Sequence, residues 1–214
     1  MDDNQEMVSY LLESGMIDEK VAEAMLKVKR ELFVPEEQKQ NAYFDVPLPI
    51  DRGQTISAPS IVGFMSMKLD AGEGMRILEI GAGSGYQAAI LGAMVGNKGT
   101  IYTVERKTEL IKLAEKNIEK SGVENVTIIE GDGTEGYAQE APYDRIIVTA
   151  GSPDVPKPLI EQLRKGGKML IPIGPMHSQD LVLVEKNGEI KKTEILPVAF
   201  VPLIGKYGHP EEVL

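Results

Sequence analysis

The feature that most constrains the fold is a short apolar run that leads into a glycine-rich turn and then a helix. Its residues are Ile77-Leu78-Glu79-Ile80-Gly81-Ala82-Gly83-Ser84-Gly85-Tyr86, followed by an apolar stretch at 87–94. Glycine permits a tight turn and lets a ligand approach the backbone closely. In doubly wound folds, nucleotides bind at such a turn, at the carboxyl end of the first parallel strand. The segment predicts an α/β fold with a ligand site here.

Strand-sized apolar runs alternate with helical stretches after this turn, which is typical of an α/β protein. We therefore expect a Rossmann-like, doubly wound, mostly parallel sheet covered on both faces. The clearest helix is 108–121, with an apolar stripe that Gly122 ends. A tight Asn187-Gly188 turn predicts an antiparallel hairpin from 181 onward. The expected strands of the core are 76–80, 100–104, 126–130, 145–149 and 168–173.

The N-terminal part predicts helices and then a long loop. Val21, Met25, Val28 and Leu32 recur at helical spacing, with Asp18 as the expected cap and Pro35 as the expected stop. Residues 42–59 carry three prolines and no periodicity, so we expect a long, partly extended loop. Long irregular loops in compact domains often carry function. A further short helix is expected at 61–69.

The length of 214 residues suits one domain. We divide it into a helical cap with an active-site loop at 1–70, an α/β core at 71–175, and a C-terminal hairpin with a substrate-side segment at 176–214. The net charge of −10 does not favour nucleic acid or membrane partners. The chain has no cysteine, an acidic start and no long apolar run, so we expect a cytoplasmic protein. A monomer is favoured, although the oligomeric state stays open.

The spacing of the glycines distinguishes between nucleotides. The turn departs from the G-x-G-x-x-G fingerprint of dinucleotide sites, because Tyr86 stands three residues past Gly83. The form acid-x-G-x-G-x-G, led by Glu79, resembles the S-adenosyl-L-methionine motif of class I methyltransferases. Glu105, at the end of the second strand, is placed to accept hydrogen bonds from ribose hydroxyls. Gly131-Asp132-Gly133 after the third strand fits an adenine site, although Asp-Gly is also an ordinary turn.

The sequence contains few candidates for a general base. His177 and His209 lie in loop-like sequence, where we expect surface positions, and no cluster of residues indicates a metal site. Methyl transfer to a carboxylate needs no base, because a carboxyl group with a pKa of about 4 is already an anion at neutral pH. The enzyme need only align and desolvate it. The scarcity of catalytic groups therefore fits an acceptor that is itself a carboxylate.

Nearly the whole chain resembles the protein-L-isoaspartate O-methyltransferase family. The glycine turn alone indicates only the superfamily, whereas GQTISAP at 53–59 and FVPL at 200–203 are specific to the family. Asp51 departs from it, standing where relatives often have glycine, and Ile204 stands where some have a polar residue. The other matching stretches are RELFVP at 30–35, PLPI at 47–50, YTVER at 102–106, APYDRIIVTAG at 141–151 and PLIEQLRKGGKMLIPIG at 158–174.

The resemblance implies a protein repair enzyme that methylates the α-carboxylate of L-isoaspartyl residues in damaged proteins and peptides. S-adenosyl-L-methionine is the implied donor and S-adenosyl-L-homocysteine the product, and the methyl ester returns through a succinimide to aspartate. Ser57 is the implied active-site position, which we interpret as a hydrogen-bond donor to the acceptor, because no His or Lys is evidently poised to activate it.

The resemblance also implies which residues bind each ligand. The substrate peptide is expected to contact Ser57, Val201, Pro202 and Leu203. The cofactor is expected to contact Gln54, Thr55, Ile56, Ser57, Glu79, Gly81, Ala82, Gly83, Ser84, Gly85, Glu105, Arg106, Asp132 and Gly133.

Three other functions stay open. A class I methyltransferase could act on another acceptor, such as a small-molecule acid or a nucleobase. A nucleotide-binding module would bind the same cofactor without turnover. An NAD-dependent oxidoreductase is disfavoured by the glycine spacing and by the lack of room for a substrate domain.

Overall fold

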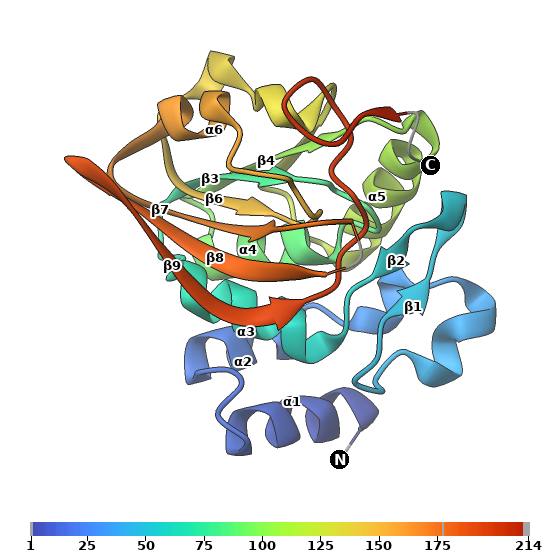
Figure 1. The fold of residues 1–214 in the computed structure, drawn as a ribbon. Coiled ribbons are helices and arrows are strands. Elements are labelled where there is room, and N and C mark those ends of the chain that lie inside the picture. The colour runs from blue at the N-terminus through green and yellow to red at the C-terminus, as the bar shows by residue number, and fades with distance from the viewer. Residues whose placement is uncertain (1, 177, 212–214) are drawn as a thin grey trace.

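The computed structural model describes residues 2–176 and 178–211, so the prediction for His177 lies outside the described residues. A seven-stranded sheet forms the centre, in the order β5-β4-β3-β6-β7-β8-β9 (Figure 1). The first five of these strands are parallel, and the last two are antiparallel. The bounds are β3 Arg76–Ile80, β4 Thr100–Glu105, β5 Val126–Glu130, β6 Tyr143–Val148, β7 Leu163–Ile173, β8 Gln179–Asn187 and β9 Glu189–Val198.

This sheet confirms the predicted doubly wound, mostly parallel fold with a C-terminal hairpin. The strands agree with the predicted ranges at most ends. The exception is β7, which begins five residues earlier than predicted, because Leu163 pairs with Tyr143 across a register shift. The turn after β8 contains Gly188 at φ 94°, a backbone conformation that suits the predicted Asn-Gly hairpin.

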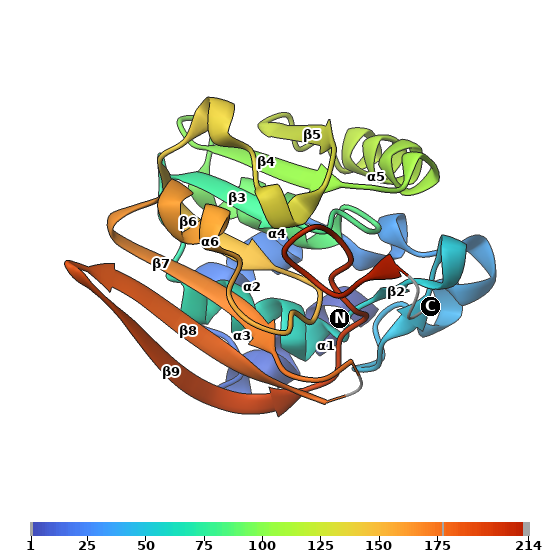
Figure 2. The same cartoon turned by 45° about the horizontal axis from the view of Figure 1, so that its top comes forward.

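Two apolar cores lie on opposite faces of the sheet, because successive side chains of a strand point to opposite sides. Ile77 of β3 belongs to the core under the helices, and its neighbour Leu78 to the other core. Helices α3 (Pro59–Leu69), α4 (Tyr86–Val95) and α5 (Thr108–Ser121) pack on the first face, and α1 (Asp3–Glu13) and α2 (Glu19–Lys27) lie outside them. Helix α6 (Lys157–Gln162) and the segment after β9 cover the second face (Figures 1 and 2). Between β5 and β6 the chain forms the short 3₁₀ helices Gly133–Glu135 and Ala138–Glu140.

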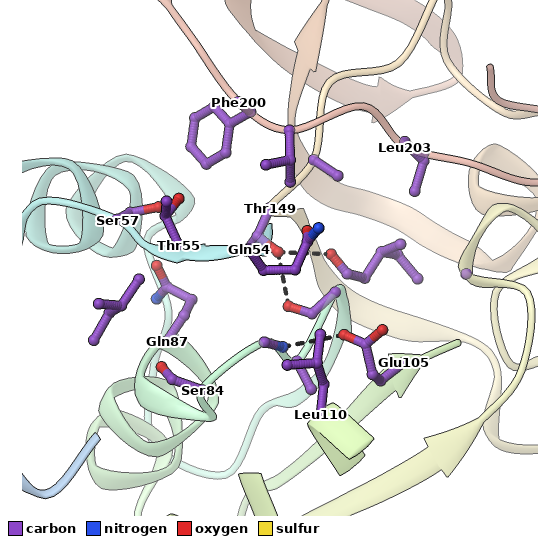
Figure 3. A pocket seen from close by; sticks show the side chains of 18 of the residues that line it. Gln54, Thr55, Ser57, Ser84, Gln87, Glu105, Leu110, Thr149, Phe200 and Leu203 are labelled. Atoms are coloured by element: carbon purple, nitrogen blue, oxygen red, sulfur yellow. Dashed lines mark hydrogen bonds between the residues drawn. The ribbon is translucent and has the colours of Figure 1, made fainter. Parts of the chain in front are cut away.

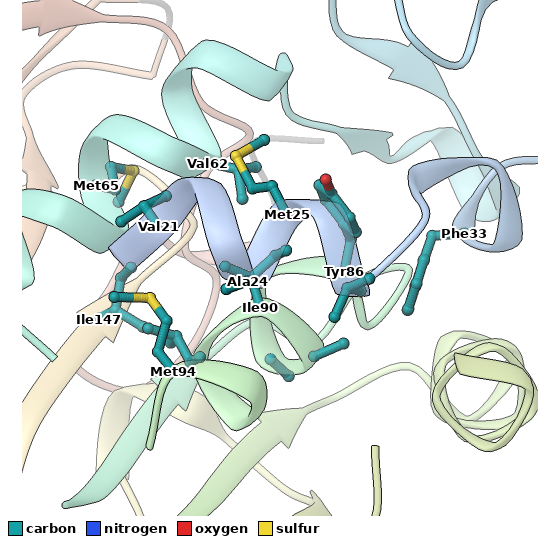
Figure 4. Packing of buried hydrophobic residues seen from close by; sticks show 14 of the residues in the cluster. Val21, Ala24, Met25, Phe33, Val62, Met65, Tyr86, Ile90, Met94 and Ile147 are labelled. Carbon is teal, nitrogen blue, oxygen red and sulfur yellow. The ribbon is translucent and has the colours of Figure 1, made fainter. Parts of the chain in front are cut away.

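Helix α4 (Tyr86–Val95) is buried on nearly all sides, which explains why its sequence is apolar throughout. It lies between the sheet and the N-terminal helices, where α2 packs against both α3 and α4 (Figure 4). Met25 of α2 and Met65 of α3 are fully or almost fully buried in this core. Helix α3 spans Pro59–Leu69, and α5 spans Thr108–Ser121, ending at the predicted Gly122.

The N-terminal helices differ from the prediction at one point. Helix α1 spans Asp3–Glu13 and α2 spans Glu19–Lys27, capped by Asp18 as predicted. Val28 is extended, and Arg30–Phe33 forms a separate 3₁₀ helix, so the prediction of one helix continuing through Leu32 to Pro35 is wrong. The break turns Arg30 into the interior, where its Nε donates to the Ala42 carbonyl at 2.8 Å.

The loop predicted at 42–59 is present and carries a small hairpin. Strand β1 (Leu48–Pro49) pairs with β2 (Thr55–Ile56) on either side of the 3₁₀ turn Asp51–Gly53. A further 3₁₀ helix, Glu36–Asn41, precedes the loop. No helix within residues 2–176 and 178–211 has both the length and the apolar character to span a membrane.

Gly63 on α3 is placed so that an added methyl group would reach Ile17 Cγ2 at 2.4 Å and Met25 Sδ at 3.3 Å. We expect Gly63→Ala to lower the free energy of unfolding by about 1 to 3 kcal/mol through overpacking. The higher helix propensity of alanine, worth about 1 kcal/mol, acts in the opposite direction. Urea denaturation measures the change, with Lys68→Ala on the exposed side of the same helix as the control. Equal stability of the two variants would contradict the packing argument.

Candidate active site

A cavity of about 260 Å³ opens beyond the carboxyl ends of β3 and β4 (Figure 3). The chain passes from β3 to β4 on one side and later returns to β6 on the other, so the cavity lies where the strand order reverses. Ligands bind at such switch points in open α/β sheets. The wall comprises residues 53–57, the glycine turn, the end of β4, Thr149 after β6, and 200–204.

The glycine turn approaches the end of β6 so closely that Gly81 has no room for a side chain. Gly81 has φ 97°, and a Cβ there would lie 2.5 Å from the Thr149 hydroxyl. That hydroxyl lies 2.9 Å from the Ile80 carbonyl and 2.7 Å from the Gly81 carbonyl, so it bonds the turn to β6. Gly81, Ala82, Gly83 and Ser84 all line the cavity, as predicted for a cofactor turn.

Gly85 lies outside the lining. It has φ 87° at the start of α4, and a Cβ would lie 3.0 Å from Ile118 Cδ1 and 3.3 Å from Ala114 Cα. Glycine here lets α4 pack closely against α5, and its assignment as a cofactor contact stays a prediction.

Glu105 is held on the cavity wall by three backbone donors. Its Oε2 accepts from Gly83 N at 3.2 Å, and its Oε1 accepts from Arg106 N at 2.9 Å and Lys107 N at 3.0 Å. A carboxylate offers about four acceptor sites, so one is left for a ligand. Glu105 is 7% exposed, and its side chain faces the cavity beside Leu110 (Figure 3). The predicted acceptor therefore lies on the wall in a fixed orientation.

Glu79, the acid that leads the motif, lies behind the cavity instead of on its wall. Its side chain is fully buried, and neither carboxyl oxygen has a hydrogen bond of normal geometry to the described residues. Burial raises the pKa of Glu79 to about 8. The hydroxyl of its cross-strand neighbour Thr103 acts to lower this pKa, and the negative charge of Glu105 acts to raise it further. Glu79 therefore carries a proton at neutral pH.

Asp132 and Gly133, which were predicted to contact adenine, have different positions. Gly133 lines the cavity, and Asp132 does not. Asp132 Oδ1 accepts from the backbone and hydroxyl of Thr134 at 2.9 and 2.7 Å, and its Oδ2 accepts from Lys206 N at 2.8 Å. The carboxylate thus ties the turn after β5 to the segment after β9.

Residues 54–57, the cofactor contacts that the resemblance implies, line the larger cavity, and their contact with a cofactor stays a prediction. Thr55 and Ser57 also line an adjoining cavity of about 150 Å³. Its other lining residues are Pro47, Ala58, Ile61, Thr149 and residues 197–201. Ser57 therefore lies at the junction of the two cavities, near Thr55 in Figure 3. Among the residues that the structure describes, no titratable side chain lines the smaller cavity.

The segment 201–203 is docked on the loop after β6. Gly151 N donates to the Val201 carbonyl at 2.8 Å, and Leu203 N donates to the Gly151 carbonyl at 2.7 Å. Val201, Pro202 and Leu203 line the larger cavity, and Val201 also reaches the smaller one. The structure thus brings the predicted substrate residues onto the same walls as Ser57.

Other wall residues were not predicted. Thr149 and Phe200 line both cavities, and Gln87, Leu110 and Ile204 line the larger one. Thr149 follows β6 directly, so the rule that ligands bind at the carboxyl ends of strands would have found it. Gln87 and Leu110 carry no comparable signal, because they belong to apolar helical stretches.

A set of charged contacts closes the loop over the larger cavity. The Arg52 guanidinium pairs with Glu109 of α5 at 2.6 Å, and Lys107 Nζ donates to the Arg52 carbonyl at 3.2 Å. Arg52 has φ 56°, and the carboxylate of Asp51 accepts from its backbone nitrogen at 2.7 Å. Asp51, which departs from the family pattern, therefore stabilises this turn.

The remaining predicted groups occupy the edge of the site. Arg106 lines the larger cavity, and its guanidinium pairs with Glu211 at 2.6 Å. His209 lines neither cavity and is half-buried, with its Nε2 shielded from solvent, so the expected surface position is wrong. Its backbone nitrogen donates to the Leu203 carbonyl at 2.7 Å. Within the described residues, no three His, Cys, Asp or Glu side chains gather where they could hold a metal ion.

A model of the protein-L-isoaspartate(D-aspartate) O-methyltransferase family matches residues 2–208 of the chain. The chain belongs to this family. A relative named protein-L-isoaspartate O-methyltransferase, from Methanothrix thermoacetophila, is 54% identical over 92% of this chain and 95% of its own length. One of the same name from Methanopyrus kandleri is 53% identical over 97% and 93%. The family predicted from the motifs is confirmed.

Solved structures with the same family name agree in fold. One protein-L-isoaspartate O-methyltransferase superposes with a TM-score of 0.88 at 31% identity, over 96% of this chain and 67% of its own. A structure described as a putative member of the family from Plasmodium falciparum, in complex with S-adenosyl-L-homocysteine, superposes with a TM-score of 0.84 at 27% identity. That alignment covers 95% of this chain and 99% of the other.

The buried Glu79 predicts a pH dependence of stability. Its pKa in the folded protein, about 8, lies above the ordinary 4.5, so between these values the folded state holds a proton that the unfolded chain has released. The contribution of Glu79 to stability is therefore full below about pH 4.5 and is lost as the pH rises towards about 8. The variant Glu79→Gln stays neutral throughout. We expect its unfolding free energy to rise relative to the parent between about pH 5 and pH 8.

Urea denaturation of both proteins across this range measures the difference. A difference that is independent of pH would contradict the assignment of a neutral Glu79.

Proposed function

We propose that this chain transfers a methyl group from S-adenosyl-L-methionine to the α-carboxylate of L-isoaspartyl residues in damaged proteins and peptides. The methyl ester then returns through a succinimide to aspartate. The observation that carries the proposal is the meeting of two cavities at Ser57 and Thr149, in a chain of the protein-L-isoaspartate O-methyltransferase family.

The larger cavity fits S-adenosyl-L-methionine. The left-handed Gly81 turn leaves no room for a Cβ, and the Glu105 carboxylate keeps one free acceptor site on the wall, suited to a ribose hydroxyl. Gly133 and Leu203 face the same space, and residues 54–57 close it from the opposite side. When bound, the cofactor supplies an electrophilic methyl group on a sulfonium sulfur.

The smaller cavity suits the acceptor. Its side chains are apolar apart from the hydroxyls of Thr55, Ser57 and Thr149, and backbone polar atoms form the rest of its surface, so a carboxylate that enters it exchanges part of its hydration for these fixed groups. The Thr149 hydroxyl is already engaged with the turn after β3. Of the other two hydroxyls, Ser57 is our candidate to donate a hydrogen bond to one carboxylate oxygen, because the family resemblance implies it as the active-site position. The other oxygen is then directed at the larger cavity.

Methyl transfer in this arrangement requires alignment of the acceptor carboxylate with the methyl group and no proton transfer. The acceptor is an anion at neutral pH, so attack on the methyl carbon requires no general base. The described residues that line the smaller cavity carry no titratable group, which agrees with this requirement.

The test of the proposal is methyl transfer from labelled S-adenosyl-L-methionine to a short peptide that contains L-isoaspartate, beside the same peptide with L-aspartate. We expect a base-labile label on the isoaspartyl peptide alone. Binding of the cofactor without labelling of either peptide would refute the proposed acceptor.

Ser57→Ala tests the orienting role. We expect kcat to fall on the order of 100-fold, as for the loss of one positioned donor, while the Kd for S-adenosyl-L-methionine changes little. Isothermal titration and the peptide assay measure the two quantities. Ser14→Ala serves as the matched control, because the Ser14 hydroxyl donates to the Leu11 carbonyl and Ser14 lines neither cavity. An equal loss of cofactor affinity and turnover would contradict an orienting role.

A further inference from the structure

The loop 42–47, which leads into β1, is held firmly from within the protein. Arg30 Nε donates to the Ala42 carbonyl at 2.8 Å, and its Nη2 lies 3.4 Å from the Val46 carbonyl. The Asp45 carboxylate accepts from Ser60 N at 2.8 Å, which ties the loop to the first turn of α3. The loop therefore has a defined position relative to Ser57, three residues before Ser60.

Arg30 itself is anchored in the core. Its side chain is fully buried, and its guanidinium carbon lies 5.3 Å from the centre of the Tyr86 ring. Tyr86 is the first residue of α4 and lines the larger cavity, and its ring also packs against Phe33 at 5.2 Å between ring centres. The buried arginine thus links the loop to the same helix that carries the glycine turn.

Two apolar side chains of this firmly held loop point into solvent. Phe44 is 62% exposed and Val46 is 44% exposed. Single exposed apolar residues are common and need no explanation. Here, however, two of them flank one anchored residue, Asp45, and Val46 N donates to the Phe44 carbonyl at 2.8 Å, which fixes their separation along the turn. We name Phe44 and Val46 the apolar rim.

The apolar rim adjoins the smaller cavity. Pro47, the next residue after Val46, lines this cavity, as does Ala58, two residues before the Ser60 that holds Asp45. Residues 197–201, whose side chains are apolar, line the same cavity. The rim therefore extends the apolar wall of the acceptor cavity outward on the side of β1.

We infer that the apolar rim binds the side chain next to the isoaspartyl residue in the substrate polypeptide. This inference rests on the proposed function, because it takes the smaller cavity as the site of the acceptor carboxylate. Once that carboxylate is at Ser57, the polypeptide on either side of it must leave the cavity across its edges, and the rim is one of those edges. Phe44 and Val46 are then specificity-determining residues that favour a neighbour with an apolar side chain.

This specificity suits the chemistry of damaged proteins. Apolar side chains are mostly buried in folded proteins and become accessible when a segment unfolds. A rim that binds them directs the enzyme towards isoaspartate in unfolded segments. A rigid rim also binds with a smaller loss of conformational freedom than a mobile one.

The experiment compares isoaspartyl peptides that differ in one neighbouring residue. Leucine is placed immediately before or immediately after isoaspartate, and a third peptide has glycine at both positions. For the parent protein we expect kcat/KM to be about tenfold higher with leucine at one of these positions, mainly through KM. In the double variant Phe44→Ala, Val46→Ala we expect the leucine-to-glycine ratio to fall to about one. Phe44→Leu, which keeps an apolar side chain, is expected to retain most of the ratio.

Tyr10→Ala is the matched control, because Tyr10 on α1 is 64% exposed and lines neither cavity. It is expected to keep the parent ratio. A parent without preference for leucine at either position would overturn the inference, and so would a double variant that keeps the preference. Failure of the parent to methylate any of the three peptides would instead refute the proposed function.

Discussion

The site depends on the contact between the ends of two adjacent parallel strands, β3 and β6. Thr149 N donates to the Ile80 carbonyl at 3.0 Å, and the Thr149 hydroxyl bonds the same turn. This contact fixes the path of the glycine turn, since Gly81 has no space for a side chain beside it. The glycine turn also orients Gly83 N towards the carboxylate of Glu105. A cofactor cavity at this edge follows from strand order, because β3 is the strand at which the chain changes direction across the sheet.

The second half of the site is contributed by segments that are far from this turn in sequence. Asp132 holds the backbone of Lys206, and Gly151 holds the backbone of Val201 and Leu203, so the segment after β9 is fastened at both ends. On the other side, buried Arg30 and Asp45 hold the loop that precedes β1. These polar contacts place apolar side chains around a space that is left open. The loop before β1 and the segment after β9 therefore belong to the walls of the site as much as the α/β core does.

Sequence reasoning predicted the parts that depend on local pattern. The alternation of apolar runs predicted the parallel strands, the glycine spacing predicted the turn, and the position at the end of β4 predicted Glu105, since each of these follows from neighbouring residues. It did not predict that α2 ends at Lys27, because helical spacing continues to Leu32 and only the distant carbonyl of Ala42 accounts for the inward turn of Arg30. It also gave no sign that Glu79 lies behind the cavity or that Asp132 bonds to Thr134 and Lys206. Those outcomes depend on which long-range partners each carboxylate meets.

The docking of residues 201–203 on Gly151 also sets the order in which the site can be assembled. Synthesis delivers a chain from its N-terminus, and a domain generally folds as a unit. The glycine turn, Glu105 and Ser57 all precede β6, whereas residues 201–203 follow every strand of the sheet. A partly synthesised chain therefore exposes the apolar face that Leu203 later covers, and has only half a cofactor cavity. The complete cofactor cavity and the closed second core therefore both require residues 201–203.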